Sequence, residues 1–138
     1  MTADLELVVA GLLVSKNRVL LGHRHPARLH FPNCWDFPGG HIEADETDRM
    51  ALRRELHEEL GIELDIGARP EDVRIFGDGY DLKIWTITEW SGEVANRAPE
   101  EHDALEWFDS SELASITLAS AGYLQICLDV IAAGESVS

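Results

Sequence analysis

Short runs of apolar or alternating residues, separated by turn residues, predict most of the secondary structure of this chain. Such runs are typical of β-strands, and residues 5–15 form the most continuous of them. The dipeptide Asp78-Gly79 favours a hairpin turn between two of the runs. We therefore expect strands at 5–15, 18–24, 62–66, 73–76, 82–90 and 105–108, with 82–90 as a long central strand.

Residues 47–60 have the pattern of a helix. They contain no glycine or proline and many strong helix formers. Asp45 and Thr47 are both candidate N-caps, and Gly61 suits a left-handed stop at the C-terminal end. The segment should therefore be helical from about Thr47 up to Gly61.

A second helix is predicted near the C-terminus, at 117–133. Its apolar positions recur at three- and four-residue steps, namely at Ala121, Leu124, Leu128 and Ile131. Residues 110–113 are expected to form a short helical turn before it. Two helices and six or seven strands in mixed order predict an α/β fold, with a mixed sheet covered on both faces.

Three glutamates should lie together on the helix at 47–60. Residues three and four apart share a helix face, so Glu55, Glu58 and Glu59 form one acidic strip. The strip borders the leucines that face the core, which should shelter it in part. Clustered, sheltered carboxylates favour a hard divalent cation such as Mg²⁺. The alternative is a solvated acidic face in which Arg54 pairs with Glu58.

The residues around this helix resemble the signature of the Nudix hydrolases. That signature reads G-x5-E-x7-R-E-U-x-E-E-x-G-U, where U is a bulky aliphatic residue. A match at every fixed position is far more specific than an isolated glycine-rich motif. The matching residues are Gly40, Glu46, Arg54, Glu55, Leu56, Glu58, Glu59, Gly61 and Ile62.

The resemblance implies a Nudix α/β/α sandwich, with residues 1–138 as a single domain. Its mixed sheet would carry the signature helix and the C-terminal helix on opposite faces. The resemblance also implies metal-dependent hydrolysis of a phosphoanhydride, with Mg²⁺ or Mn²⁺ as cofactor. A salt bridge between Glu46 and Arg54 would orient the ligands. The implied metal ligands are Glu55, Glu58, Glu59 and the carbonyl of Gly40.

The general base is left open among several acids. In the family it is either a glutamate of the signature, here Glu55 or Glu59, or an acid on a later loop. The loop at 91–103 is suitable, and Glu101 is the first choice among Glu100, Glu101 and His102. The alternative is that these residues are simply an exposed acidic loop.

We expect the substrate to contact residues in the segment that precedes the helix. Gly39 and Gly40 would let the backbone approach a ligand closely. Arg24 and Arg28 offer positive charge, and the neighbouring His30 and Phe31 offer a further polar group and a stacking surface. The alternative is that these are ordinary surface residues.

The chain is strongly acidic, with a net charge of −15 over 138 residues. That charge argues against sequence-independent binding to nucleic acid. Cys34 and Cys127 lack metal-ligand spacing and indicate reduced thiols. The acidic N-terminus is unlike a signal peptide, and the apolar run at 7–14 is too short to cross a membrane. We therefore expect a cytoplasmic protein that binds a small nucleotide, and neither nucleic acid nor membrane. Homodimers are common in the family.

Within the family, the expected activity is that of a MutT-like nucleoside triphosphate diphosphatase, which releases a nucleoside monophosphate and pyrophosphate. The alternatives are a hydrolase of dinucleoside polyphosphates, ADP-ribose or nucleotide sugars, and a non-catalytic nucleotide-sensing module. ADP-ribose-directed relatives tend to have a proline near Gly77 and Asp78, and dinucleoside polyphosphate hydrolases a tyrosine, for which Tyr80 is a candidate. A sensing module should have lost metal-binding acids, and all are present here. An RNA-decapping enzyme fits poorly with the acidic charge.

Overall fold

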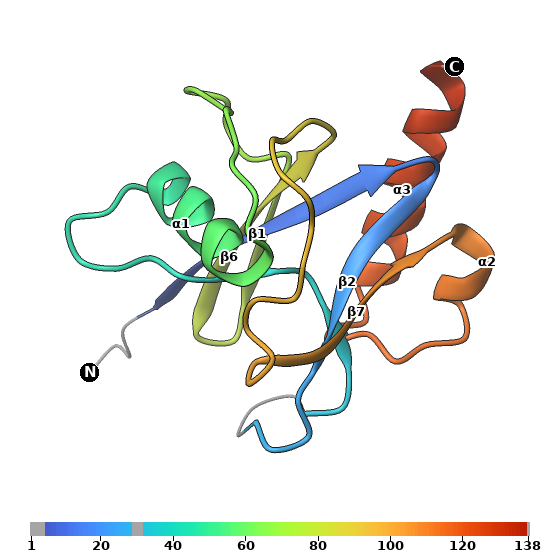
Figure 1. Cartoon of the computed structure of the whole chain (residues 1–138), viewed down its shortest axis with the longest axis horizontal. Coiled ribbons are helices and arrows are strands. Elements are labelled where there is room, and N and C mark those ends of the chain that lie inside the picture. Colours follow the sequence, from blue (N-terminus) through green and yellow to red (C-terminus); the bar gives the residue numbers. More distant parts are fainter. Residues whose placement is uncertain (1–4, 29–31, 138) are drawn as a thin grey trace.

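The apolar run near the start of the chain forms β1 (Glu6–Ser15), the strand on which most of the sheet is assembled (Figure 1). The computed structural model describes residues 5–28 and 32–137. The other elements are, in chain order, β2 (Arg18–Arg24), β3 (Trp35–Asp36), β4 (Gly39–His41), α1 (Asp48–Leu60), β5 (Val73–Gly77), β6 (Tyr80–Ile87), β7 (His102–Phe108), α2 (Ser110–Leu113) and α3 (Tyr123–Val137).

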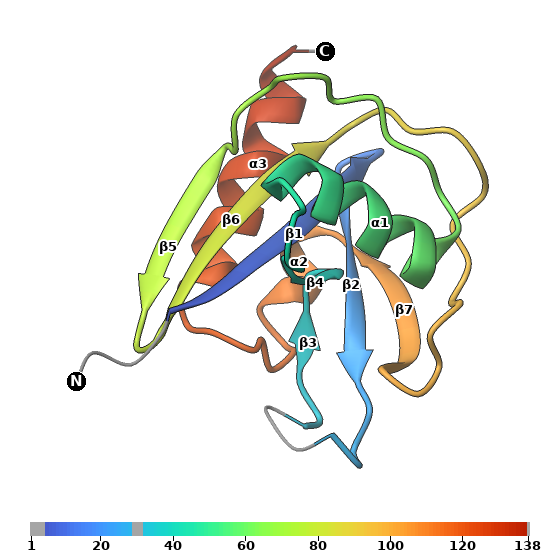
Figure 2. The ribbon, with the colours of Figure 1, turned by 90° about the vertical axis from the view of Figure 1, so that its left-hand side faces the viewer.

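The sheet is mixed, and its main strand order is β3-β2-β1-β6-β5. β6 runs parallel to β1 over most of its length, from Glu6 opposite Tyr80 to Leu13 opposite Ile87. β2 is antiparallel to β1 and pairs with it only beside their turn. β4 pairs with the first half of β1, and β7 pairs with β2. β1 and β2 therefore diverge, and β3 and β4 occupy the space between them (Figure 2).

Two hydrophobic clusters cover the two faces of the sheet, as the alternation of apolar residues along the strands requires. On one face, Leu52, Leu56 and Leu60 of α1 pack against Val9, Leu13 and Trp85 among others. On the other face, Tyr123, Cys127 and Ile131 of α3 pack against residues such as Leu12 and Ile84. Figure 2 shows the sheet between the two helices. The prediction that the two helices lie on opposite faces of a mixed sheet is confirmed.

The C-terminal helix begins later than the sequence predicts. The expected start was 117, but α3 begins at Tyr123. The intervening segment pairs with the short edge strand instead: Trp35 donates to the Thr117 carbonyl at 2.8 Å and accepts from the Ala119 N–H at 2.8 Å. Ala121 therefore lies outside the helix, and the prediction for 117–122 is wrong because tertiary pairing overrides a helical pattern.

Three strand predictions also need correction. Residues 62–66 form no strand, and only Glu63 makes an isolated bridge, to Ser91. The strand expected at 82–90 is β6, which is interior but not central and ends at Ile87, where its pairing with β1 ends. β7 begins at His102, before the expected 105. The turn at Asp78-Gly79 is confirmed.

No helix within residues 5–28 and 32–137 is long and apolar enough to cross a membrane. That 1–138 is one domain stays a prediction.

Candidate active site

The helix α1 begins and ends where its capping residues predict. The Thr47 side chain accepts from the Met50 N–H at 3.2 Å, so Thr47 is the N-cap. Asp45, the other candidate, lies before the helix in a left-handed conformation with φ 66°. Gly61 ends the helix at φ 74° and donates its N–H to the His57 carbonyl at 3.0 Å. The face of α1 that meets the sheet is the one that carries Leu52, Leu56 and Leu60.

The three glutamates of α1 are buried to very different degrees. Glu59 is 2% exposed and lies among the residues of the core. The Glu55 side chain is 14% exposed, whereas that of Glu58 is 57% exposed. The acidic strip therefore runs from solvent at Glu58 into the protein at Glu59, and the predicted partial shelter applies to two of its three members.

Arg54 joins the acidic residues into one network. Its guanidinium makes two hydrogen bonds to Glu46, Nε to Oε2 at 2.7 Å and Nη2 to Oε1 at 3.0 Å. Its Nη1 also contacts Glu55 at 2.9 Å and Glu58 at 3.2 Å. The expected salt bridge between Glu46 and Arg54 is thus present. Because Arg54 also pairs with Glu58, the alternative of a simple i, i+4 pair describes part of the same network.

Gly40 lies directly against the Glu55 carboxylate. A Cβ atom at this position would lie 2.6 Å from the carboxyl carbon of Glu55. A side chain at Gly39 would meet the backbone of Val9 and Ala10 in β1. Both glycines are part of β4. They are needed because β4 is packed between β1 and the acidic face of α1.

Glu59 has a partner that comes from β7. His102 Nε2 and Glu59 Oε1 are 3.0 Å apart, and His102 is only 5% exposed. The half-buried Glu101 lies next to them, and one ligand atom from each of the three residues falls within 4.8 Å of the others. The structure therefore brings two of the loop candidates, Glu101 and His102, to Glu59 on the acidic face of α1.

The electrostatics of this cluster are dominated by burial. Burial raises the pKa of Glu59 to about 7, although the hydrogen bond from His102 lowers it. Burial also raises the pKa of Glu55, an effect that Arg54 opposes. In the metal-free protein both carboxylates therefore hold protons more tightly than exposed glutamates do. A cation between them would reverse this effect.

Arg24 and Arg28, the two arginines expected to contact the substrate, both interact with the carboxylate of Asp36. Arg24 Nη1 lies 3.3 Å from Asp36 Oδ2 in β3, so this arginine already has a carboxylate neighbour. Burial raises the pKa of Asp36. The charges of Arg24 and of Arg28, which follows in the same segment, oppose this rise. His30 and Phe31 lie outside the described residues. Asp36 was not predicted from the sequence, because one acid in an aromatic segment gives no signal of its own.

The donor atoms of the acidic face fit a hard divalent cation. The Glu59 Oε2 atom is buried and has no hydrogen-bond partner among the described residues. A buried carboxylate oxygen in this state is unfavourable unless a cation or an ordered water satisfies it. Glu55 and Glu101 supply further oxygen ligands nearby, the kind that Mg²⁺ and Mn²⁺ prefer. The geometry thus fits the expected metal, with Glu59 at its centre and Glu58 at its exposed edge.

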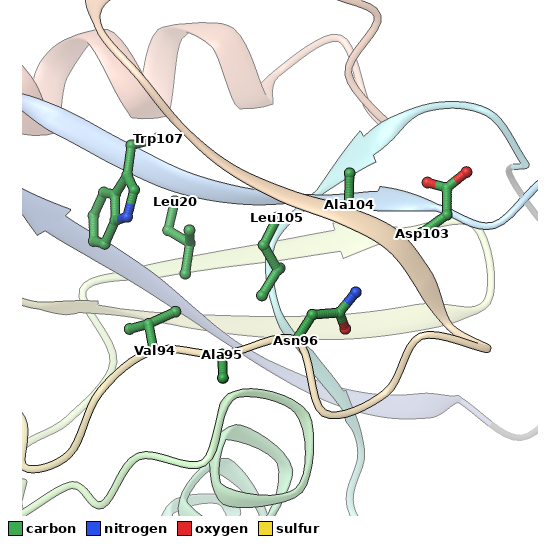
Figure 3. A pocket seen from close by; sticks show the side chains of 8 residues that line it. All are labelled: Leu20, Val94, Ala95, Asn96, Asp103, Ala104, Leu105 and Trp107. Carbon is green, nitrogen blue, oxygen red and sulfur yellow. The ribbon is translucent and has the colours of Figure 1, made fainter.

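Two hollows lie on the surface, and the glutamates of α1 are not among the residues that line them. The larger, of about 560 Å³, is lined by Ser15, Lys16, Arg18 and Trp107, at the other end of β2 from Arg24. The other, of about 410 Å³, lies between β7 and the preceding loop (Figure 3). Leu105, Trp107, Asn96 and Asp103 are among its lining residues. The large aromatic side chains of Trp85 and Phe108 are buried in the core, so they are not exposed to a ligand.

Residues 5–126 match the profile of the NUDIX domain family, and the chain belongs to that family. It is 35% identical over 116 residues to the CTP pyrophosphohydrolase of Escherichia coli K12, covering 83% of each chain. It is 38% identical over 112 residues to a putative 8-oxo-dGTP diphosphatase 2 of Mycobacterium tuberculosis H37Rv, covering 78% of this chain and 76% of that relative. The solution structure of the E. coli ORF135 protein superposes with a TM-score of 0.70 at 30% identity, covering 94% of this chain and 90% of the other. The chain is a MutT-like Nudix hydrolase.

The hydrogen bonds of Arg54 allow us to predict the effect of replacing it by lysine. Arg54→Lys keeps the charge but loses the planar pair of bonds to Glu46 and the third contact to Glu55. We expect a loss of roughly 10- to 100-fold in metal affinity or activity, because groups that orient metal ligands have effects of that size. Steady-state kinetics with a metal titration measure it. Arg53→Lys, the exposed neighbour on the other side of α1, is the matched control. Equal behaviour of the two variants would contradict an orienting role for Arg54.

Proposed function

We propose that this enzyme is a divalent-metal-dependent nucleoside triphosphate diphosphatase that releases a nucleoside monophosphate and pyrophosphate. The observation that carries the proposal is the buried Glu59 Oε2 atom, which lacks a partner among the described residues and lies beside Glu55 and Glu101. A carboxylate oxygen held in that way suits a cation that also binds phosphate oxygens. The net charge of −15 makes such a cation necessary, because the protein itself would repel a polyphosphate.

The residues of the site have distinct tasks in this proposal. Glu59, Glu55 and the carbonyl of Gly40 hold Mg²⁺ or Mn²⁺, and Glu58 joins them only by turning away from Arg54. The bound ion supplies charge neutralisation at the phosphoanhydride and a lower pKa for water. Arg54 holds the carboxylates in place through its contacts to Glu46 and Glu55. The contacts of Arg54 with Glu46 and Glu55 support this assignment.

The proton acceptor for the attacking water is assigned to Glu101. It is half-buried at the edge of the site, and its charge contributes to the raised pKa values of Glu55 and Glu59. In the described network Arg54 contacts Glu55 and His102 contacts Glu59, whereas neither is paired with the Glu101 side chain, so its oxygens are available to water. Glu55 and Glu59 are the alternatives, and both are better suited to holding the ion.

The names of the relatives support nucleoside triphosphates as the substrate class. One is a CTP pyrophosphohydrolase and another is a putative 8-oxo-dGTP diphosphatase. Hydrolysis of dinucleoside polyphosphates is less favoured here, because Tyr80 packs against Gly77 within the β5–β6 hairpin. A structural role therefore explains this tyrosine.

A substrate panel tests the proposal. The purified protein is incubated with Mg²⁺ or Mn²⁺ and with CTP, dCTP, 8-oxo-dGTP, ADP-ribose and diadenosine tetraphosphate, and the products are separated by ion-exchange chromatography. We expect one or more of the triphosphates to give the monophosphate and pyrophosphate, with no product in excess EDTA. Faster turnover of ADP-ribose or the dinucleotide than of every triphosphate would overturn the substrate class, and metal-independent turnover would overturn the mechanism.

A further inference from the structure

His102 is held in place by its backbone as well as by its packing. Its N–H donates to the Ala98 carbonyl at 3.0 Å, and its carbonyl accepts from the Asn96 side-chain amide at 2.8 Å. Its ring lies over Gly22 of β2, where a Cβ atom would be 2.8 Å from His102 Cδ2. Gly22 thus leaves the space that the imidazole fills. The ring has a fixed position before any ligand binds.

The same loop also holds the end of the helix that carries Glu59. The N–H of Arg97 donates to the Glu59 carbonyl at 2.8 Å, and the N–H of Ala95 donates to the Leu60 carbonyl at 3.0 Å. These bonds satisfy carbonyls that the last turn of a helix leaves without partners. Figure 3 shows the loop, with Ala95 and Asn96, between α1 and β7. One short segment therefore sets the distance between the two side chains.

We propose that His102 is a positioning residue that fixes the rotation of the Glu59 carboxylate. When Glu59 is ionised, Nε2 of His102 carries the proton and donates to Oε1 at 3.0 Å. That bond occupies one oxygen and would leave the other, Oε2, to bind a cation. The inference rests on the proposed role of Glu59 as a metal ligand and adds the group that orients it.

Direct coordination of the ion by His102 does not fit the geometry. Its Nε2 is engaged by Glu59, and its Nδ1 is buried without a partner among the described residues, on the far side of the ring from that contact. A hard cation also prefers oxygen ligands to imidazole. A ligating carboxylate, in contrast, commonly receives a hydrogen bond from a neighbouring group that orients it.

Two substitutions of His102 that differ in side-chain length test the proposal. In His102→Gln the side-chain amide lies near the position of Nε2 and can donate the same bond, whereas His102→Asn is too short to reach Glu59. Mn²⁺ binding is measured by electron paramagnetic resonance on protein without nucleotide, and kcat and KM are then measured with the best triphosphate. We expect His102→Asn to weaken Mn²⁺ binding roughly 10- to 100-fold and His102→Gln to stay within about three-fold of the wild type.

The matched control is another histidine–carboxylate pair, which joins β2 to β7. His23 Nδ1 lies 2.7 Å from Asp103 Oδ1, and His23→Asn should leave Mn²⁺ binding unchanged. With saturating metal, His102→Asn should lower kcat and leave the KM for nucleotide nearly constant. A smaller folded fraction would reduce the number of Mn²⁺ sites without changing their affinity, so the measured affinity separates the positioning role from a general loss of stability.

Several outcomes would overturn the inference. Wild-type Mn²⁺ affinity in His102→Asn would do so, and so would an equal loss in His102→Gln and His102→Asn. If His102→Asn does not fold, a loss beyond ten-fold in folded His102→Gln overturns it alone. A wild-type protein that binds Mn²⁺ in the expected pattern but hydrolyses none of the triphosphates would refute the proposed function and leave the positioning role intact.

Discussion

Replacing Glu59 by glutamine is expected to lower kcat roughly a thousand-fold, equivalent to about 4 kcal/mol of transition-state stabilisation, with the fold intact. Glutamine has almost the same shape as glutamate, so the contacts of this buried residue with its neighbours in the core are kept. It lacks the negative charge that a cation between Glu59 and Glu55 requires. The effect should be large because Glu59 offers the buried oxygen that has no other partner among the described residues.

The measurement is kcat with saturating triphosphate and Mg²⁺, next to a thermal unfolding curve that verifies the fold. Glu63→Gln is the control, because Glu63 is an exposed glutamate just beyond the end of α1 and outside the acidic network. It should retain wild-type turnover. Normal turnover in Glu59→Gln would contradict the assignment of Glu59 as a metal ligand and with it the centre of the proposed site.

The local elements of the fold were predictable because their signals are local. The helix α1 is specified by its composition and by the caps Thr47 and Gly61, all of which lie within a few residues of it. The start of α3 was not predictable in that way. Residues near 117 have helical spacing, but they pair with Trp35, which is distant in sequence. No local pattern near 117 indicates that pairing. Long-range pairing likewise decided where β6 and β7 begin and end.

The sequence predicted which acidic residues lie together at the candidate site. It did not predict how deeply each of them is buried. The signature positions identified Glu55, Glu58, Glu59 and the bridge between Glu46 and Arg54, and the structure brings these together. Helical periodicity gives the direction of a side chain, but it does not show which loop covers that face. Glu59 is buried because the loop before β7 lies over the end of α1 and supplies His102. Helical spacing places Glu59, seven residues after Leu52, closer to the leucines than Glu58, but it does not give the depth of burial.

The same substitution, Glu59→Gln, is expected to stabilise the metal-free protein. Burial raises the pKa of Glu59 from 4.5 to about 7, so the folded state binds this proton more tightly than the unfolded state does. The stability of the folded state therefore falls as pH rises from about 4.5 to about 7, and above that range the whole penalty is present. A shift of this size corresponds to about 3 kcal/mol. Glutamine cannot ionise, so the variant should lack this loss.

Urea unfolding in excess EDTA, at about pH 5 and about pH 8, measures the difference. We expect Glu59→Gln to be more stable than the wild type near pH 8, and most of that gap to close near pH 5, where the wild-type carboxyl is protonated. Glu63→Gln should match the wild type at both values.

Added Mg²⁺ or Mn²⁺ should stabilise the wild type more than Glu59→Gln, because an ion that binds only the folded state shifts the equilibrium by mass action. A variant no more stable than the wild type near pH 8 would show that the buried carboxylate is satisfied without metal. The expected result would instead show that the protein keeps an unfavourable charge in its interior because catalysis requires it.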